Sequence, residues 1–216
     1  MLGRFLERKS ESPQSGQPAR SGHRVPRHSS GWAVLRKRMQ AEPGLRVVDA
    51  GGTSPTNINY LASLGHSIFM ADLVDDAYES DWQTGVDEDD KPILNVEGFL
   101  EQTLNFSGRT FDIVLLWATL DYLPEPFVVP VVNRLHASMN SGGQVLAFFH
   151  TKAQGEQTGF TRFHLTEGDD VQIQAAKPHP IQRAFSNRNI ENLFGKWSGF
   201  RQFLAKDGVS EVIITR

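Results

Sequence analysis

Apolar residues recur along the chain in short continuous runs and in stretches with helical spacing. Residues 45–49 and 66–72 are short runs typical of buried strands, and residues 55–64 between them carry an apolar helical face. Ser54 is a typical residue just before a helix, and Gly65 is a typical residue just after one. The pattern predicts a strand, a glycine-containing turn, a helix and a second strand, which together form a βαβ unit.

The same alternation continues on both sides of this unit. Residues 32–39 have the spacing of a short amphipathic helix, and residues 124–139 have that of a longer one. Residues 111–117 and 144–150 are nearly continuous apolar runs, as expected for parallel strands that are covered on both faces. These elements predict a layered α/β domain.

The last third of the chain has a different pattern. Residues 160–176 are expected to form an exposed hairpin, able to act as a lid, and a helix is expected after Ser186. Two strands at 200–204 and 209–215 flank Asp207-Gly208, a hairpin signal, so they should be antiparallel. The predicted fold class is therefore α/β, a doubly wound and mostly parallel sheet with an antiparallel C-terminal hairpin.

The beginning of the chain lacks such periodicity. Residues 1–30 of the 216 are rich in Ser, Gly, Pro and Arg, with six basic and two acidic residues. A segment with so few apolar side chains cannot offset the entropy of ordering, so we expect a disordered basic tail. Residues 31–216 then form one α/β domain that contains the hairpin at 160–176.

Composition narrows the classes of function. The chain has a net charge of −3 and no cysteine, which excludes cysteine nucleophiles, disulfide scaffolds and iron–sulfur clusters. Residues 72–90 hold nine acids and no base, so we expect a solvated loop there and no nucleic-acid-binding surface on the body. No apolar run approaches the roughly 18 residues that a membrane span requires. The absence of cysteine agrees with a reducing compartment, and the expected location is cytoplasmic.

Candidate binding chemistry lies where strands are predicted to end. Gly51 and Gly52 follow the strand 45–49, and glycine lets the backbone approach a ligand closely. Asp72 ends the next strand, about twenty residues further on, where a carboxylate can accept both hydroxyls of a ribose.

The order of these motifs resembles that of the class I S-adenosylmethionine-dependent methyltransferases. That family has a D-x-G-x-G-x-G turn, an acid that ends strand two, and an acid shortly before a Leu-Pro-Phe-like step. It also has FD-[VI]-V at the start of strand four and Pro-Gly-Gly before strand five. The matching segments here are residues 47–51, Asp72, residues 101–106, residues 111–114 and residues 141–143. The resemblance implies an S-adenosylmethionine cofactor and covers roughly residues 31–216.

The resemblance also implies roles for individual residues. The turn formed by Asp49, Gly51, Gly52 and Thr53 would face the methionine part of the cofactor, and Asp72 would hold the ribose hydroxyls. Glu101 would lie near the adenine amino group. The further residues that would contact the cofactor are Leu104, Phe106 and Trp117. On this basis, Gly51→Val should abolish cofactor binding and leave the protein folded.

The acceptor is expected to be a small molecule, because no added recognition domain is present. Candidate catalytic residues on the acceptor side are Asp121, Tyr122 and His150, whereas His164 and His179 are expected at the surface. No group of residues has the spacing of metal ligands.

Two alternatives stay open. Thr53 and Pro55 stand where the family has glycines, which is compatible with a catalytically silent relative that serves as a binding or regulatory module. An NAD-type oxidoreductase would also use an acid at the end of strand two, but G-x-G-x-x-G is absent.

Overall fold

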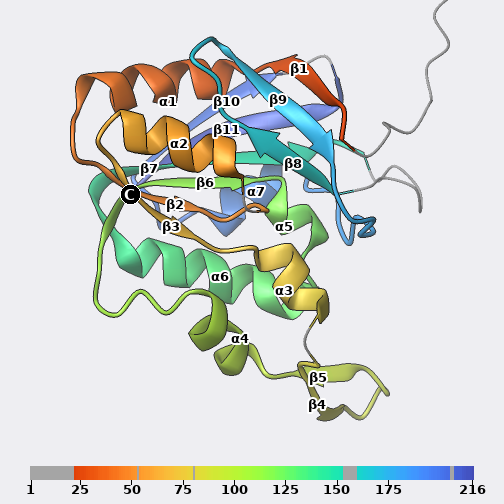
Figure 1. Ribbon diagram of the computed structural model, residues 1–216. Coiled ribbons are helices and arrows are strands. Elements are labelled where there is room, and N and C mark those ends of the chain that lie inside the picture. Colours follow the sequence, from red (N-terminus) through yellow and green to blue (C-terminus); the bar gives the residue numbers. More distant parts are fainter. Residues whose placement is uncertain (1–21, 53, 80, 153–159, 205–206) are drawn as a thin grey trace, which may run out of the picture.

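The computed structural model describes residues 22–52, 54–79, 81–152, 160–204 and 207–216. Helices cover both faces of a central six-stranded sheet in the order β10-β11-β7-β6-β2-β3 (Figure 1). The strands are β2 (Arg46–Asp49), β3 (Ser67–Met70), β6 (Phe111–Trp117), β7 (Met139–His150), β10 (Gly199–Leu204) and β11 (Val209–Thr215). The first four pair in parallel, and β11 is antiparallel to both β7 and β10. The predicted doubly wound, mostly parallel sheet with an antiparallel C-terminal hairpin is confirmed.

Alternating side chains of the strands enter two separate cores. Val47 lies in the core under α1 (Ser30–Ala41) and α2 (Pro55–Ser63), whereas Val48 lies in the core on the opposite face. Both valines are fully buried, which explains the continuous apolar runs of the parallel strands. The second core is covered by α3 (Leu73–Glu79), α4 (Val96–Thr103), α6 (Glu125–Ser138) and α7 (Asn187–Leu193). The short helix α5 (Thr119–Tyr122) follows β6.

Local signals set the ends of two helices as expected. The Ser54 hydroxyl accepts a hydrogen bond from the Asn57 backbone N–H, and Pro55 begins α2. Ser186 caps α7, where its side chain and that of Asn189 form a reciprocal capping box.

A second sheet, in the order β1-β9-β8, lies beside α1 and α2 (Figure 1). Its strands are β1 (Arg24–His28), β9 (Asp170–Ala175) and β8 (Thr161–His164), all antiparallel. The hairpin at 160–176 is present, but it is not exposed as expected, because Phe163, Leu165 and Val171 pack into the core under α1 and α2.

The same sheet corrects the expectation for residues 1–30. Residues 22–30 are ordered, and β1 pairs with β9 along its whole length, whereas residues 1–21 lie outside the described residues. The sequence argument weighed apolar side chains, but β1 is held by main-chain hydrogen bonds to a strand about 145 residues away.

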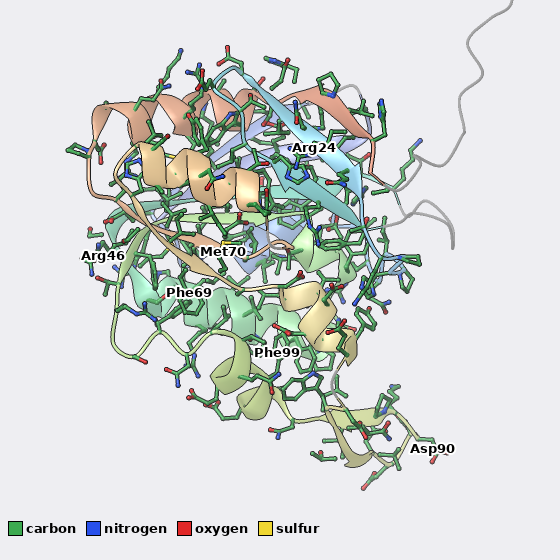
Figure 2. The ribbon with its side chains drawn as sticks, in the orientation of Figure 1. Arg24, Arg46, Phe69, Met70, Asp90 and Phe99 are labelled. Atoms are coloured by element: carbon green, nitrogen blue, oxygen red, sulfur yellow. The ribbon has the colours of Figure 1, made fainter. Side chains whose placement is uncertain are left out.

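The acidic stretch 72–90 also contains more structure than the expected loop. Its first part forms α3, which buries Leu73, Val74 and Ala77. A hairpin of β4 (Gln83–Val86) and β5 (Pro92–Leu94) follows and projects from the body, with Asp90 at its tip (Figure 2). Within the described ranges, no helix has the length and apolar character needed to cross a membrane.

Candidate functional site

The turn after β2 surrounds a carboxylate that accepts hydrogen bonds from the protein itself. Asp49 is fully buried, and its side chain accepts hydrogen bonds from Asn57 Nδ2 and Trp117 Nε1, both at 2.8 Å. The Gly51 backbone N–H lies 3.4 Å from the same carboxylate. Burial raises the pKa of Asp49 to about 6, against the effect of these donors. Asp49 therefore ties the turn to α2 and to the end of β6.

The bare backbone at Gly51 accommodates Trp117. A Cβ added to Gly51 would lie 2.5 Å from Trp117 Cδ1, which is too close for any side chain. Trp117 ends β6 with a φ of 50° and stacks on Phe163 of β8, with ring centroids 5.0 Å apart. Gly51→Val would therefore displace a buried tryptophan, which corrects the expectation that this variant stays folded.

Gly52 and Asp72 lie together, as the sequence predicts. A Cβ added to Gly52 would lie 3.1 Å from Asp72 Oδ2 and 3.0 Å from Nε of Arg162, a residue of β8. Asp72 is half-buried just beyond the end of β3, and burial followed by the neighbouring Asp75 carboxylate raises its pKa. Thr53, the remaining predicted residue of the turn, lies outside the described residues.

Strand β8 covers the beginning of α2. His164 Nδ1 lies 2.7 Å from the Ser54 hydroxyl, and Leu165 N donates to Asn57 Oδ1 at 2.7 Å. His164 is 1% exposed, so it is not the surface histidine that the sequence suggested. Burial lowers its pKa, and the Arg24 and Arg162 charges act in the same direction. A neutral, hydrogen-bonded histidine therefore joins β8 to α2.

Three further residues that were predicted to contact the cofactor pack against other parts of the protein. Glu101 is exposed on α4 and pairs with Arg134 of α6, and Leu104 is buried in the core. Phe106 packs edge-to-face on Phe111, the first residue of β6, with centroids 4.7 Å apart. Phe106 also packs on Phe69 of β3, with centroids 5.0 Å apart. No hydrogen bond, ion pair or ring contact among the described residues joins these three side chains to Asp72, so their contact with the cofactor stays a prediction.

The three candidate catalytic residues do lie together, on α5 and at the end of β7. Asp121 Oδ2 accepts hydrogen bonds from His150 Nδ1 at 2.6 Å and from His150 N at 2.7 Å. Burial raises the pKa of Asp121, although the bonds from His150 oppose this effect. The Tyr122 ring packs edge-to-face on His150, and burial raises the pKa of its hydroxyl.

A cavity of about 240 Å³ adjoins this group. Ala118 and His150, which lie at the ends of β6 and β7, form one side, and Thr161 and Phe163 of β8 form another. Arg27 of β1 also lines it. The ligands of open α/β sheets bind beyond the carboxyl ends of the strands, which is where this cavity lies.

Comparisons with known proteins give matches to solved structures alone. No model of a known protein family matches the chain, and no curated protein matches it. TehB from Haemophilus influenzae is similar with a TM-score of 0.46 and 12% identity, over 85% of this chain and 61% of that one. This chain therefore spans less than two thirds of TehB.

Two further similar structures are methyltransferases by their descriptions. One is 1,6-didemethyltoxoflavin-N1-methyltransferase from Burkholderia thailandensis, with bound S-adenosylhomocysteine. Its TM-score is 0.44 and its identity 13%, over 87% of this chain and 77% of that one. The other is an S-adenosylmethionine-dependent methyltransferase from Mesorhizobium loti. Its TM-score is 0.45 and its identity 12%, over 87% of this chain and 98% of that one. At these identities the likeness is one of fold alone.

Proposed function

We propose that the chain binds S-adenosylmethionine beside Gly52 and Asp72 and transfers its methyl group to a small-molecule acceptor. The observation that carries the proposal is the position of the Asp72 carboxylate directly against the bare backbone of Gly52. A half-buried carboxylate at this place can accept the hydroxyl groups of a ribose.

The residues present fit such a ligand on one side of the turn. Asp72 offers hydrogen-bond acceptors, and Arg162 Nε, which is buried and without an acceptor in the described part of the chain, offers a donor. The space at Gly51 is taken by Trp117, and the Asp72 and Arg162 side chains lie over Gly52, so the fit rests on these two side chains and not on open space at either glycine.

The reaction would require little chemistry from the protein. The bound cofactor supplies a methyl group that the positive sulfur already activates. The protein then has to hold the acceptor in line and exclude water. The cavity beside His150 is our proposed acceptor site, because it lies beyond the ends of β6 and β7.

His150 and Asp121 could move a proton for an acceptor that must lose one. Asp121 accepts from Nδ1 of His150, so Nε2 is the ring nitrogen that remains to take a proton from a hydroxyl or amine. The buried Asp121 carboxylate would hold the ring in place. His150 is then the proposed base and Asp121 its positioning residue.

The silent binding module remains a second candidate, because of one specific observation. Trp117 fills the space at Gly51, and the Asp49 carboxylate is occupied by donors of the protein itself. Both features remove contacts that a ligand would otherwise make with the first half of the turn.

Calorimetric titration with S-adenosylmethionine, S-adenosylhomocysteine and NADH separates the candidates. We expect S-adenosylhomocysteine to bind the wild-type protein, and Asp72→Ala to weaken binding at least about tenfold, a loss of about 1.4 kcal/mol. Asp89→Ala, which removes an exposed carboxylate from the β4–β5 hairpin, is the matched control and should have no effect. No binding of any of the three nucleotides would contradict cofactor use, and preferential binding of NADH would favour an oxidoreductase.

A further inference from the structure

Arg162 has a guanidinium nitrogen that the described part of the protein leaves without a partner. Its Nε is buried and has no hydrogen-bond acceptor among the described residues. An unsatisfied buried donor is unfavourable, and more so when the group is charged. Buried donors normally have partners, so this guanidinium points to a missing acceptor.

The Asp72 carboxylate is not the missing acceptor of Arg162. Asp72 and Arg162 both border Gly52, but no ion pair within 4.0 Å joins these two described side chains. The two charges therefore lie side by side, with Gly52 beneath them. A ligand that spans both needs donors for Asp72 and an anionic acceptor for Arg162.

A second arginine lies on the side of the turn that faces β8. Arg24 of β1 donates to the Thr56 hydroxyl in the first turn of α2, at 3.0 Å (Figure 2). The charges of Arg24 and Arg162 both lower the pKa of His164, which is buried against Ser54 at the start of α2. Two cations therefore lie within electrostatic reach of His164, on a chain whose net charge is negative.

We infer that Arg162 binds the carboxylate of the amino-acid part of the adenosyl ligand, while Asp72 holds its ribose. This inference rests on the proposed function. It gives strand β8, which lies outside the main sheet, a direct part in holding the cofactor. Because Phe163 on the other face of β8 lines the cavity beside His150, one strand borders both proposed sites.

The test compares S-adenosylhomocysteine with 5′-methylthioadenosine, which keeps the adenosine and lacks the amino acid. Affinities of both compounds are measured by calorimetry for the wild type and for Arg162→Gln. We expect Arg162→Gln to weaken S-adenosylhomocysteine by about 10- to 100-fold, as for loss of a charge-assisted hydrogen bond, and 5′-methylthioadenosine by less than about twofold. Arg162→Lys keeps the charge but loses the planar guanidinium with its paired donors. Its affinity for S-adenosylhomocysteine should lie between those of the wild type and Arg162→Gln.

Two controls define the result. Arg46→Gln removes an exposed arginine at the amino end of β2, on the opposite side of the view from Arg24, and should change neither affinity (Figure 2). Thermal melting reports whether each variant is folded, and Arg162→Lys replaces Arg162→Gln in the comparison if the latter does not fold.

The outcomes are distinguishable. Equal losses for both compounds, or no loss for either, would overturn the role of Arg162 and leave the proposed function standing. Failure of the wild type to bind either compound would overturn the proposed function itself. Inorganic phosphate that binds the wild type without competing with S-adenosylhomocysteine, and is lost in Arg162→Gln, would show a separate anion site and also overturn the inference.

Discussion

Among the described residues, three carboxylates are buried almost completely, and each serves a different part of the molecule. Asp49 organises the turn after β2, Asp121 holds His150, and Glu211 holds the junction between β1 and α1. Burial of an ionised carboxylate is unfavourable unless donors surround it. The hydrogen bonds to these three carboxylates therefore hold the neighbouring segments in position.

Asp49 should make stability depend on pH. Its pKa in the folded protein is about 6, above the ordinary value of 3.8, so the folded state binds this proton more tightly than the unfolded state. Its contribution to stability is complete below about pH 3.8 and is lost as the pH rises through about 6. Urea unfolding should show the wild type losing more stability than Asp49→Asn between pH 4.5 and pH 7. Identical pH dependence in the two proteins would contradict the assigned shift.

Trp117→Phe should separate packing from hydrogen bonding at the turn. The phenyl ring keeps the contact with Phe163, but the buried Asp49 loses its indole donor. We expect a loss of about 1–3 kcal/mol in the free energy of unfolding, measured in urea. Trp197→Phe, at a half-buried tryptophan, is the comparison and should cost less. Equal losses in both variants would show that the Asp49–Trp117 bond contributes nothing specific.

At the residue scale, the sequence identified part of the site. Asp72 and Gly52 follow from strand ends and glycine chemistry, and the structure brings them together. Arg162 and His164 could have been singled out, because they alternate on one face of a predicted strand whose other face is apolar. Glu101, Leu104 and Phe106 were placed by resemblance, and the described contacts of Glu101 and Phe106 are with Arg134, Phe69 and Phe111 rather than with Asp72.

At the scale of elements, β1 shows what local pattern reasoning misses. The strand reads as a polar, proline-containing segment and is largely exposed. Its position is set by β9 and by buried Glu211, which accepts from Arg27 Nη1 at 2.5 Å, Ser29 Oγ at 2.9 Å and Gly31 N at 2.7 Å. Partners so distant in sequence leave no periodic signal near residue 24. By contrast, the βαβ elements were predictable because each carries its own periodicity and caps.

Removal of the Glu211 side chain should release β1. Glu211→Ala leaves the Ser29 hydroxyl and the Gly31 backbone N–H without their acceptor, and it leaves Arg27 with Asp207 as its one carboxylate partner among the described residues. We expect a loss of about 3–5 kcal/mol in the free energy of unfolding, and tryptic cleavage at Arg24 or Arg27 that is much faster than in the wild type. Glu191→Ala, which changes an exposed residue of α7, should leave both unchanged. Slow cleavage of Glu211→Ala would show that the pairing with β9 holds β1 without this anchor.

At the scale of the whole molecule, two sheets meet at one place. The six-stranded sheet supplies the turn, Asp72 and the Asp121–His150 pair, and the three-stranded sheet brings Arg162, Phe163 and Arg27 over them. The sequence predicted the first sheet and the hairpin of the second. It did not predict how the hairpin packs, because that depends on β1 and on contacts between distant residues such as Ser54 and His164.

Hydrogen exchange with and without S-adenosylhomocysteine tests most directly whether the turn and Asp72 form one ligand site. We expect slower amide exchange at residues 49–54, at 72–76 and along β8 when the ligand is added, and no change in the β10–β11 hairpin or the β4–β5 hairpin. Slower exchange confined to other segments, or none at any concentration up to about 1 mM, would contradict the account.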